Sequence, residues 1–177
     1  RPGGTLDELA NLAAQVSVAP AAIVVLEERL SWIPAGQTGC SPEFIETVLP
    51  VISRVAVSIH DWIELRDAQT QLPDGWRWLS CLPIRLPSGA VAGVIAVLDR
   101  SPRRLNPGQR AGLQTVARQV MVHLELRRQA TDLAATVTQV YNQQLQASPR
   151  PAGQKALILP DTASNRLVIS GPEDELE

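Results

Sequence analysis

The chain has 177 residues, of which 45% are hydrophobic, and its 16 basic and 18 acidic residues leave a net charge of −2. This length suits one domain with an appendage, whose core can be large enough to fold without disulfides or a structural metal. A nearly balanced charge without long basic runs argues against a nucleic-acid-binding surface. The longest apolar run, near residues 90–98, is shorter than the roughly 20 residues that a membrane-spanning helix needs. We therefore expect neither nucleic acid nor a membrane as a partner.

The two cysteines, Cys40 and Cys81, are far apart and have neither CxxC spacing nor an adjacent histidine. Because a structural zinc site usually needs four closely spaced ligands, we predict no metal and no cofactor, and interpret both thiols as reduced. The chain begins at Arg1 without a methionine and shows no signal-peptide pattern. We therefore expect a cytoplasmic segment of a longer protein.

The N-terminal half predicts helices alternating with short strands. Thr5 and Glu8 form a capping-box pattern at the start of a first helix, and the β-branched run 22–26 predicts a buried strand, followed by a shorter one at 31–35. Pro42 suits the first position of a second helix, which Pro50 should kink or split. A further strand is expected at residues 59–65.

The clearest strand pair is predicted at residues 76–86 and 90–98. These apolar runs flank Pro87-Ser88-Gly89, which is typical of a hairpin turn. Gly93 inside the second run indicates a bulge or a close approach of another backbone. The order of elements predicts an α+β fold, with an antiparallel sheet flanked by helices.

A long last helix should begin at Asn106-Pro107, where proline takes the first helical position, and continue to about residue 147. Beyond the domain, apolar residues repeat in alternating steps of four and three, the spacing by which two helices pack together. A pattern this short needs help from the domain surface to form a dimer. The predicted dimer seam is Leu126, Ala130, Leu133, Val137 and Val140.

The predicted domain organisation places one folded domain at residues 1–128, whose last helix extends past it. Residues 148–154 are a linker by composition, and residues 155–177 predict a short β-hairpin tail. Because an isolated hairpin is marginal in water, the tail either docks on the first domain or opens a second one.

A block of motifs toward the end of the domain resembles the GAF domain of bacterial signalling proteins, over roughly residues 5–128. The block consists of Pro83, Gly89, Gly93, Asp99, Pro102-Arg103-Arg104-Leu105 and Leu124-Glu125-Leu126-Arg127-Arg128. The resemblance implies a GAF-like fold and a non-catalytic sensory and dimerisation module, which couples ligand or partner binding to its C-terminal helix. It also implies two partners, a second copy of the chain and an effector domain of a larger protein. We expect Asp99 to pair with Arg103 or Arg104 in a structural role.

The resemblance also suggests where a ligand would bind. Small-molecule pockets of this family lie on one sheet face beneath the middle helices and loops, where this chain concentrates its aromatic residues. Those side chains could instead fill the core, which would make the chain a protein-interaction scaffold with a filled, ligand-free pocket. The candidate pocket residues are Trp32, Phe44, Ile45, His60, Trp62, Trp76 and Trp78.

Other chemistries of this family fit less well. Bilin-binding relatives attach their chromophore through a cysteine commonly followed by histidine, whereas Cys40 precedes Ser41 and Cys81 precedes Leu82. A redox enzyme would need the Cα atoms of the two cysteines within about 7 Å. His123 lies between apolar neighbours, without the surroundings of a phospho-acceptor. We therefore predict no enzymatic activity.

Overall fold

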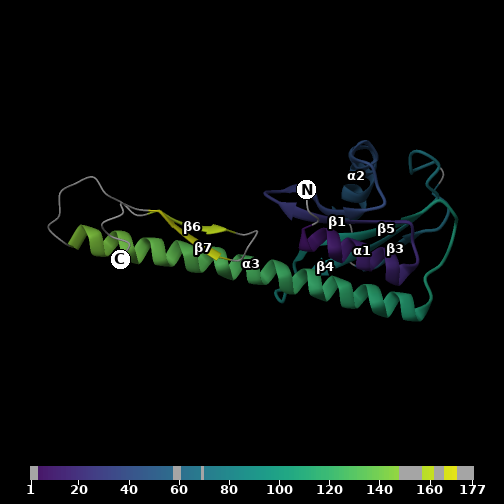
Figure 1. Cartoon of the computed structure of the whole chain (residues 1–177). Helices are drawn as coiled ribbons and strands as arrows, with labels where there is room; N and C mark the ends of the chain where they lie inside the picture. Colours follow the sequence, from purple (N-terminus) through teal and green to yellow (C-terminus); the bar gives the residue numbers. More distant parts are fainter. Residues whose placement is uncertain (1–3, 58–60, 69, 148–156, 162–165, 171–177) are drawn as a thin grey trace. The chain divides into compact units, whose positions relative to one another are not determined.

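The computed structural model describes residues 4–57, 61–68, 70–147, 157–161 and 166–170, with side chains up to residue 143. None of the helices in this part of the chain has an apolar stretch long enough to cross a bilayer. The elements that precede the tail, in chain order (Figure 1), are α1 (Thr5–Ser17), β1 (Ala21–Glu28), β2 (Ser31–Thr38), α2 (Pro42–Val57), β3 (Ile63–Leu65), β4 (Trp78–Arg85), β5 (Val91–Asp99) and α3 (Pro107–Ala147).

The chain divides into two compact units, Arg1–Met121 and Val122–Glu177, and the boundary falls inside α3. We predicted the end of the first domain a few residues further along the same helix. The second unit contains the rest of α3 and an antiparallel strand pair, β6 (Leu157–Asp161) and β7 (Arg166–Ser170). The predicted linker 148–154 lies outside the described residues.

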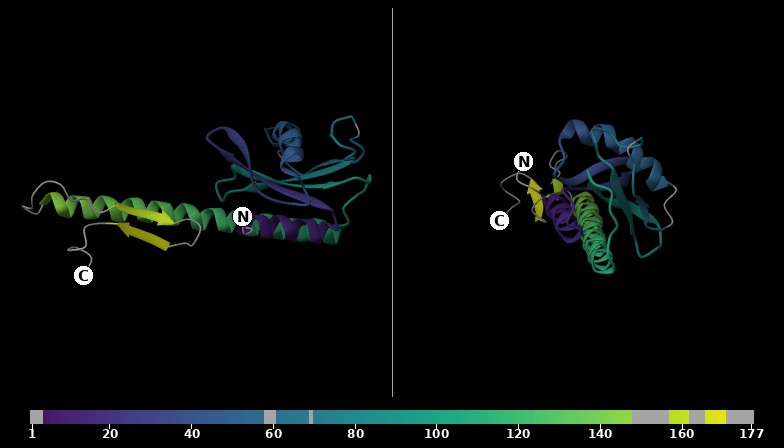
Figure 2. Two further views of the ribbon diagram at one scale, coloured as in Figure 1. Left: turned by 45° about the horizontal axis from the view of Figure 1, so that its top comes forward. Right: turned by 90° about the vertical axis from the view of Figure 1, so that its right-hand side faces the viewer.

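The first unit is built on a five-stranded antiparallel sheet with the strand order β2-β1-β5-β4-β3. Helix α2 covers one face of this sheet, while α1 and the first part of α3 run along the other face (Figure 2). An antiparallel sheet with helices on its faces confirms the predicted α+β class.

The α2 face of the sheet is a continuous apolar core. Alternate residues of the central strands point to this face, as the period of two in a β-strand requires. The buried side chains of α2 recur at helical spacing and pack against them. The strand residues are Ala21, Ile23, Val25, Leu79, Cys81, Val94, Ala96 and Leu98, and those of α2 are Phe44, Ile45, Val48, Ile52 and Ala56.

Three local predictions were wrong. Helix α1 is capped by Gly4 rather than Thr5, because Asp7 closes the cap by accepting the Gly4 N–H at 3.2 Å. The other carboxylate oxygen of Asp7 accepts the Gln37 N–H at 2.8 Å, which ties α1 to the edge strand β2. Helix α2 runs through the exposed Pro50, so the predicted split does not occur. Strand β4 begins at Trp78, so Trp76 precedes the sheet.

Gly93 lies where β5 is crowded from two sides. The pairing of β4 and β5 shifts register between Ile84 and Arg85, next to Gly93, so the predicted bulge is present. A Cβ atom on Gly93 would lie 2.5 Å from the Val25 carbonyl oxygen and 2.7 Å from Leu26 Cδ2. No side chain fits there without movement of the β1 backbone.

We expect Gly93→Val to lower the free energy of unfolding by about 3 kcal/mol or more, because overpacking against a backbone cannot relax easily. The matched substitution is Gly108→Ala in the first turn of α3, where the added Cβ would meet only the Asn106 side chain, at 3.3 Å. We expect that change to stay within about 1 kcal/mol of wild type, since alanine favours helix. Urea denaturation compares the two, and equal midpoints would contradict the assignment of Gly93 to a crowded strand.

Candidate functional site

The predicted pocket residues do not form a single cluster. Phe44 and Trp76 are buried in the core under α2 and stack on each other, with ring centroids 5.0 Å apart. Ile45 belongs to the same core, and Trp32 packs against its margin. The guanidinium of Arg100 covers the outer side of the Trp76 ring at 5.0 Å. On this face the aromatic side chains fill space in the core.

The other two tryptophans lie on the opposite face of the sheet. Trp62 donates from Nε1 to Ser80 Oγ at 2.5 Å, and Trp78 is fully buried two residues before Ser80 on the same strand. Because Trp78 and Ser80 differ by two positions, both point away from the α2 core. His60 lies outside the described residues. Sequence reasoning grouped all these residues because they share a segment, not a face.

A buried carboxylate organises the second face. The Glu64 side chain is only 6% exposed, and its neighbours Ile63 and Leu65 point to the α2 core. Oε1 of Glu64 accepts the Trp78 indole N–H at 3.1 Å and the Leu105 backbone N–H at 3.2 Å. Oε2 accepts Arg110 Nη2 at 2.9 Å. One side chain of β3 therefore joins β4, the connection before α3, and the first turn of α3.

The aromatic rings complete this arrangement, which we call the Glu64 cluster (Trp62, Glu64, Trp78, Ser80 and Arg110). The Arg110 guanidinium lies over the Trp62 ring, 5.1 Å from its centroid. Arg110 thus contacts an anion and an aromatic face together, an arrangement that suits the planar guanidinium. Burying a carboxylate is costly unless it is paired, and here three donors compensate for it.

A second set of hydrogen bonds fixes the C-terminus of α1. Arg103 donates from Nη1 to Asp99 Oδ2 at 2.9 Å and to the Val18 carbonyl at 2.6 Å, and from Nη2 to the Ser17 carbonyl. Gln109 of α3 donates to the same Ser17 carbonyl at 3.0 Å. These donors satisfy backbone carbonyls that a helix end leaves unpaired. The predicted Asp99–Arg pair is therefore present, with Arg103 as the partner, and its role is structural.

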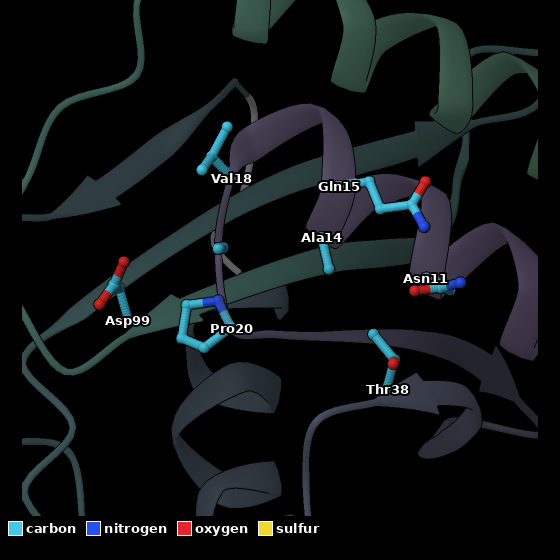
Figure 3. A pocket seen from close by; sticks show the side chains of 8 residues that line it. Asn11, Ala14, Gln15, Val18, Pro20, Thr38 and Asp99 are labelled. Atoms are coloured by element: carbon cyan, nitrogen blue, oxygen red, sulfur yellow. The ribbon is translucent and has the colours of Figure 1, made fainter.

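A wide hollow lies at this end of α1 (Figure 3). Its volume is about 640 Å³, and Asn11 and Gln15 of α1 line it together with Thr38 and Asp99. Asn11 and Gln15 are exposed, and the Asp99 carboxylate already pairs with Arg103. The hollow is wide open to solvent, and the apolar side chains of Ala14, Val18 and Pro20 also line it.

Neither cysteine is set up for redox chemistry. Burial raises the pKa of Cys81 to about 12 and that of Cys40 to about 11, so both thiols are protonated at neutral pH. Strand β4, which carries Cys81, lies three strands from β2, which leads to Cys40. The two cysteines are free and form no disulfide with each other.

Metal-ligating side chains do not gather in the described residues. No group of three or more histidine, cysteine or acidic side chains is arranged to hold an ion in that part of the chain.

Partial burial and the charge of Arg127 lower the pKa of His123, so its imidazole is neutral at pH 7. A neutral, partly covered histidine agrees with a packing role.

The predicted seam lies on the part of α3 in the second unit. Leu126, Leu133 and Val140 are 55%, 58% and 50% exposed, and they recur seven residues apart along the helix. Ala130 and Val137, at the alternate positions, are half-buried. Next to this stripe, Arg128 pairs with Glu125 at 2.9 Å and with Asp132 at 3.2 Å. The helix thus carries an apolar stripe beside a charged one.

Substituting Glu64 tests whether the cluster holds α3 to the sheet. We expect Glu64→Ala to lower the free energy of unfolding by about 2–4 kcal/mol, because three buried or half-buried donors lose their acceptor. Amide hydrogen exchange should also rise in the first turns of α3. The control is Glu46→Ala on the exposed side of α2, which should change stability by about 0.5 kcal/mol or less. Equal stability of the two variants would show that the Glu64 cluster does not fix α3 to the sheet.

Comparisons with known proteins agree with this architecture. The structure resembles the GAF domain of a phosphoenolpyruvate-protein phosphotransferase from Acinetobacter, with a TM-score of 0.55 and 18% identity over 66% of this chain and 77% of that one. It also resembles the GAF domain of a protein described as a sensor histidine kinase from Pseudomonas syringae, with a TM-score of 0.52 and 14% identity over 70% and 78%. A type II free methionine-R-sulfoxide reductase from Thermoplasma acidophilum matches with a TM-score of 0.51 and 11% identity over 63% and 83%.

No curated protein matches the chain in sequence. Sequence identities this low show only that the fold is shared. They do not show that this chain has the activities of those proteins. The sequence itself matches the GAF domain family over residues 2–124. This match covers more than half of the chain, and the chain therefore belongs to the GAF domain family.

Proposed function

We propose that the chain is a non-catalytic sensory and dimerisation module of a bacterial signal-transduction protein, and that it passes a signal through α3. The observation that carries this proposal is the Glu64 cluster, which ties the first turn of α3 to β3 and β4. Helix α3 then continues as one element to Ala147. The occurrence of GAF domains in signalling proteins such as sensor kinases supports the same role.

Coupling requires two arrangements of α3 that bind the signal with different affinity. Hydrogen bonds at the start of α3 link it to two other elements. Glu64 of β3 accepts from Leu105 and Arg110, and Gln109 donates to the Ser17 carbonyl of α1. A shift of β3 or β4 would therefore move the N-terminal turn of α3. Since an α-helix is bonded along its whole length, a tilt at one end displaces its far end.

The proposed output is a change in pairing between two copies of α3. Burying one leucine side chain contributes about 1.5–3 kcal/mol, so the exposed seam residues supply a moderate drive for association. Much of that is offset by the entropy of bringing two chains together. A dimer interface of moderate strength suits a switch, because a small structural change in the domain can then alter the dimerisation equilibrium.

We propose the absence of catalysis because neither cysteine is present as the thiolate that thiol chemistry needs. One structure with this fold is a reductase, but thiol chemistry requires a thiolate. With pKa values of about 11 and 12, Cys40 and Cys81 are almost wholly protonated.

A second candidate is a protein-interaction scaffold whose ancestral pocket is filled. The stacked and buried pair Phe44 and Trp76 favours it, because these rings occupy space beneath α2 where family ligands would lie. Under this alternative the signal is a bound protein and α3 remains the output.

Native mass spectrometry with absorbance spectroscopy on protein made in bacterial cells separates these candidates. We expect no absorbance beyond the near-ultraviolet band of the tryptophans, because both cysteines are protonated and neither adjoins a histidine. A stoichiometric colourless adduct would favour the ligand sensor, whereas a mass equal to the chain alone would favour the scaffold. A visible absorbance band in cells that supply bilin would contradict both.

Sedimentation velocity tests the proposed dimer. Replacing Leu126 and Leu133 with Glu removes apolar contacts and places like charges across the seam, so we expect a monomer with an unchanged near-ultraviolet circular dichroism spectrum. The control is the pair Thr131→Glu and Gln139→Glu, which adds the same charge at exposed positions off the seam and should leave the dimer intact. If both double variants stay dimeric, the interface lies elsewhere.

A further inference from the structure

A second hollow in the first unit lies between strand β4 and helix α3, on the face away from the α2 core. Its volume is about 390 Å³. The apolar side chains of Leu82 and Pro83 from β4 and of Ala117 and Met121 from α3 line it. This volume falls within the range of small-molecule sites, which are mostly apolar with a few converging polar groups.

The hollow lies beside an uncovered stretch of β4. Strand β3 pairs only with Leu79 to Cys81, and no other described strand pairs with the outer edge of β4 beyond that point. Pro83, the second residue past the pairing, has no N–H to donate, as is typical of proline at an open strand edge. The sheet therefore leaves space here that its own strands do not occupy.

The charged groups at this hollow are mainly cationic. Arg85 and Arg118 line it, together with the amide of Gln114 and the carboxylate of Asp61. Arg118 donates to the neutral Thr115 hydroxyl at 3.0 Å, and among the described residues it forms no salt bridge. Asp61 already accepts the Trp62 backbone N–H at 2.7 Å. Arg118 thus retains donors for an anion that enters the hollow.

We propose that this hollow binds small organic anions that have a carboxylate or phosphate head and a short apolar body. The head pairs with Arg118, because a guanidinium offers two parallel donors to a carboxylate or phosphate. Arg85 adds a second positive charge on the β4 side. The body covers Leu82, Pro83, Ala117 and Met121, which gives each half of the ligand a matching surface.

This site goes beyond the proposed sensory function, because it is separate from the face under α2 where the family binds its ligands. A ligand here touches β4 and α3 together, and Gln114, Ala117 and Arg118 lie on the helix turns that follow Arg110 of the Glu64 cluster. Binding would therefore favour one spacing between strand and helix. The existence of the site can be tested whether or not α3 transmits a signal.

The test titrates the full 177-residue chain, labelled with ¹⁵N, with hexanoate and separately with hexyl phosphate, followed by amide chemical shifts. We expect saturable shifts at residues 82–85 and 114–121 with at least one of these anions, and the tighter binder identifies the preferred head. Acetate, hexanol and hexylammonium should shift these amides weakly and without saturation. Saturable binding of hexylammonium, or no saturable shift with either anion, would overturn the proposal.

Variants locate the site. Arg118→Ala should weaken binding about tenfold, the loss expected for one charge-assisted hydrogen bond. Arg104→Ala removes the same charge at an exposed position outside the hollow and should leave binding unchanged. Arg118 is exposed on a helix, so alanine there should preserve the fold, which thermal melting checks. Equal weakening by both variants would show that general charge attraction, and not this hollow, holds the anion.

Discussion

The buried carboxylate of Glu64 is the interaction on which the arrangement of the first unit depends. It lies in the shortest strand of the sheet, yet it accepts hydrogen bonds from β4, from the connection before α3 and from α3 itself. A charge this deeply buried is tolerated only when its partners stay in place. The positions of β3, β4 and α3 are therefore interdependent, and a change at one of them carries an energetic cost at the others.

The two faces of the sheet have different chemistry. The α2 face is closed by apolar and aromatic packing, in which Phe44 and Trp76 stack on each other. Close packing of this kind resists gradual deformation. The opposite face combines apolar contacts with directional ties from Glu64 and Arg103. Because the ties from Glu64 join β3 and β4 to α3, a signal of the proposed kind would act on this face.

Helix α3 connects this face to the exposed seam of the second unit. Gln109 bonds the end of α1 and Arg110 bonds Glu64, so the first turn is held from two directions. Further along, Leu126, Leu133 and Val140 are left to solvent within a single chain. Stretches of exposed leucine and valine usually mark an interaction surface. The same helix thus combines a rigid attachment with an apolar stripe that a second copy could cover.

The α+β class, the hairpin around Gly89, the bulge at Gly93 and the long last helix could be predicted from the sequence, because periodicity and turn residues are local signals. The sequence also predicted that Asp99 pairs with Arg103 or Arg104, and the structure selects Arg103. The face that each tryptophan takes depends on tertiary packing, because Trp76 precedes β4 and packs under α2, whereas Trp78 lies within β4 and faces away from α2. Glu64 carried no signal in the sequence, where it is one acidic residue between two apolar ones. Its role arises because Trp78, Leu105 and Arg110, distant along the chain, converge on it, and such convergence depends on how strands and helices pack.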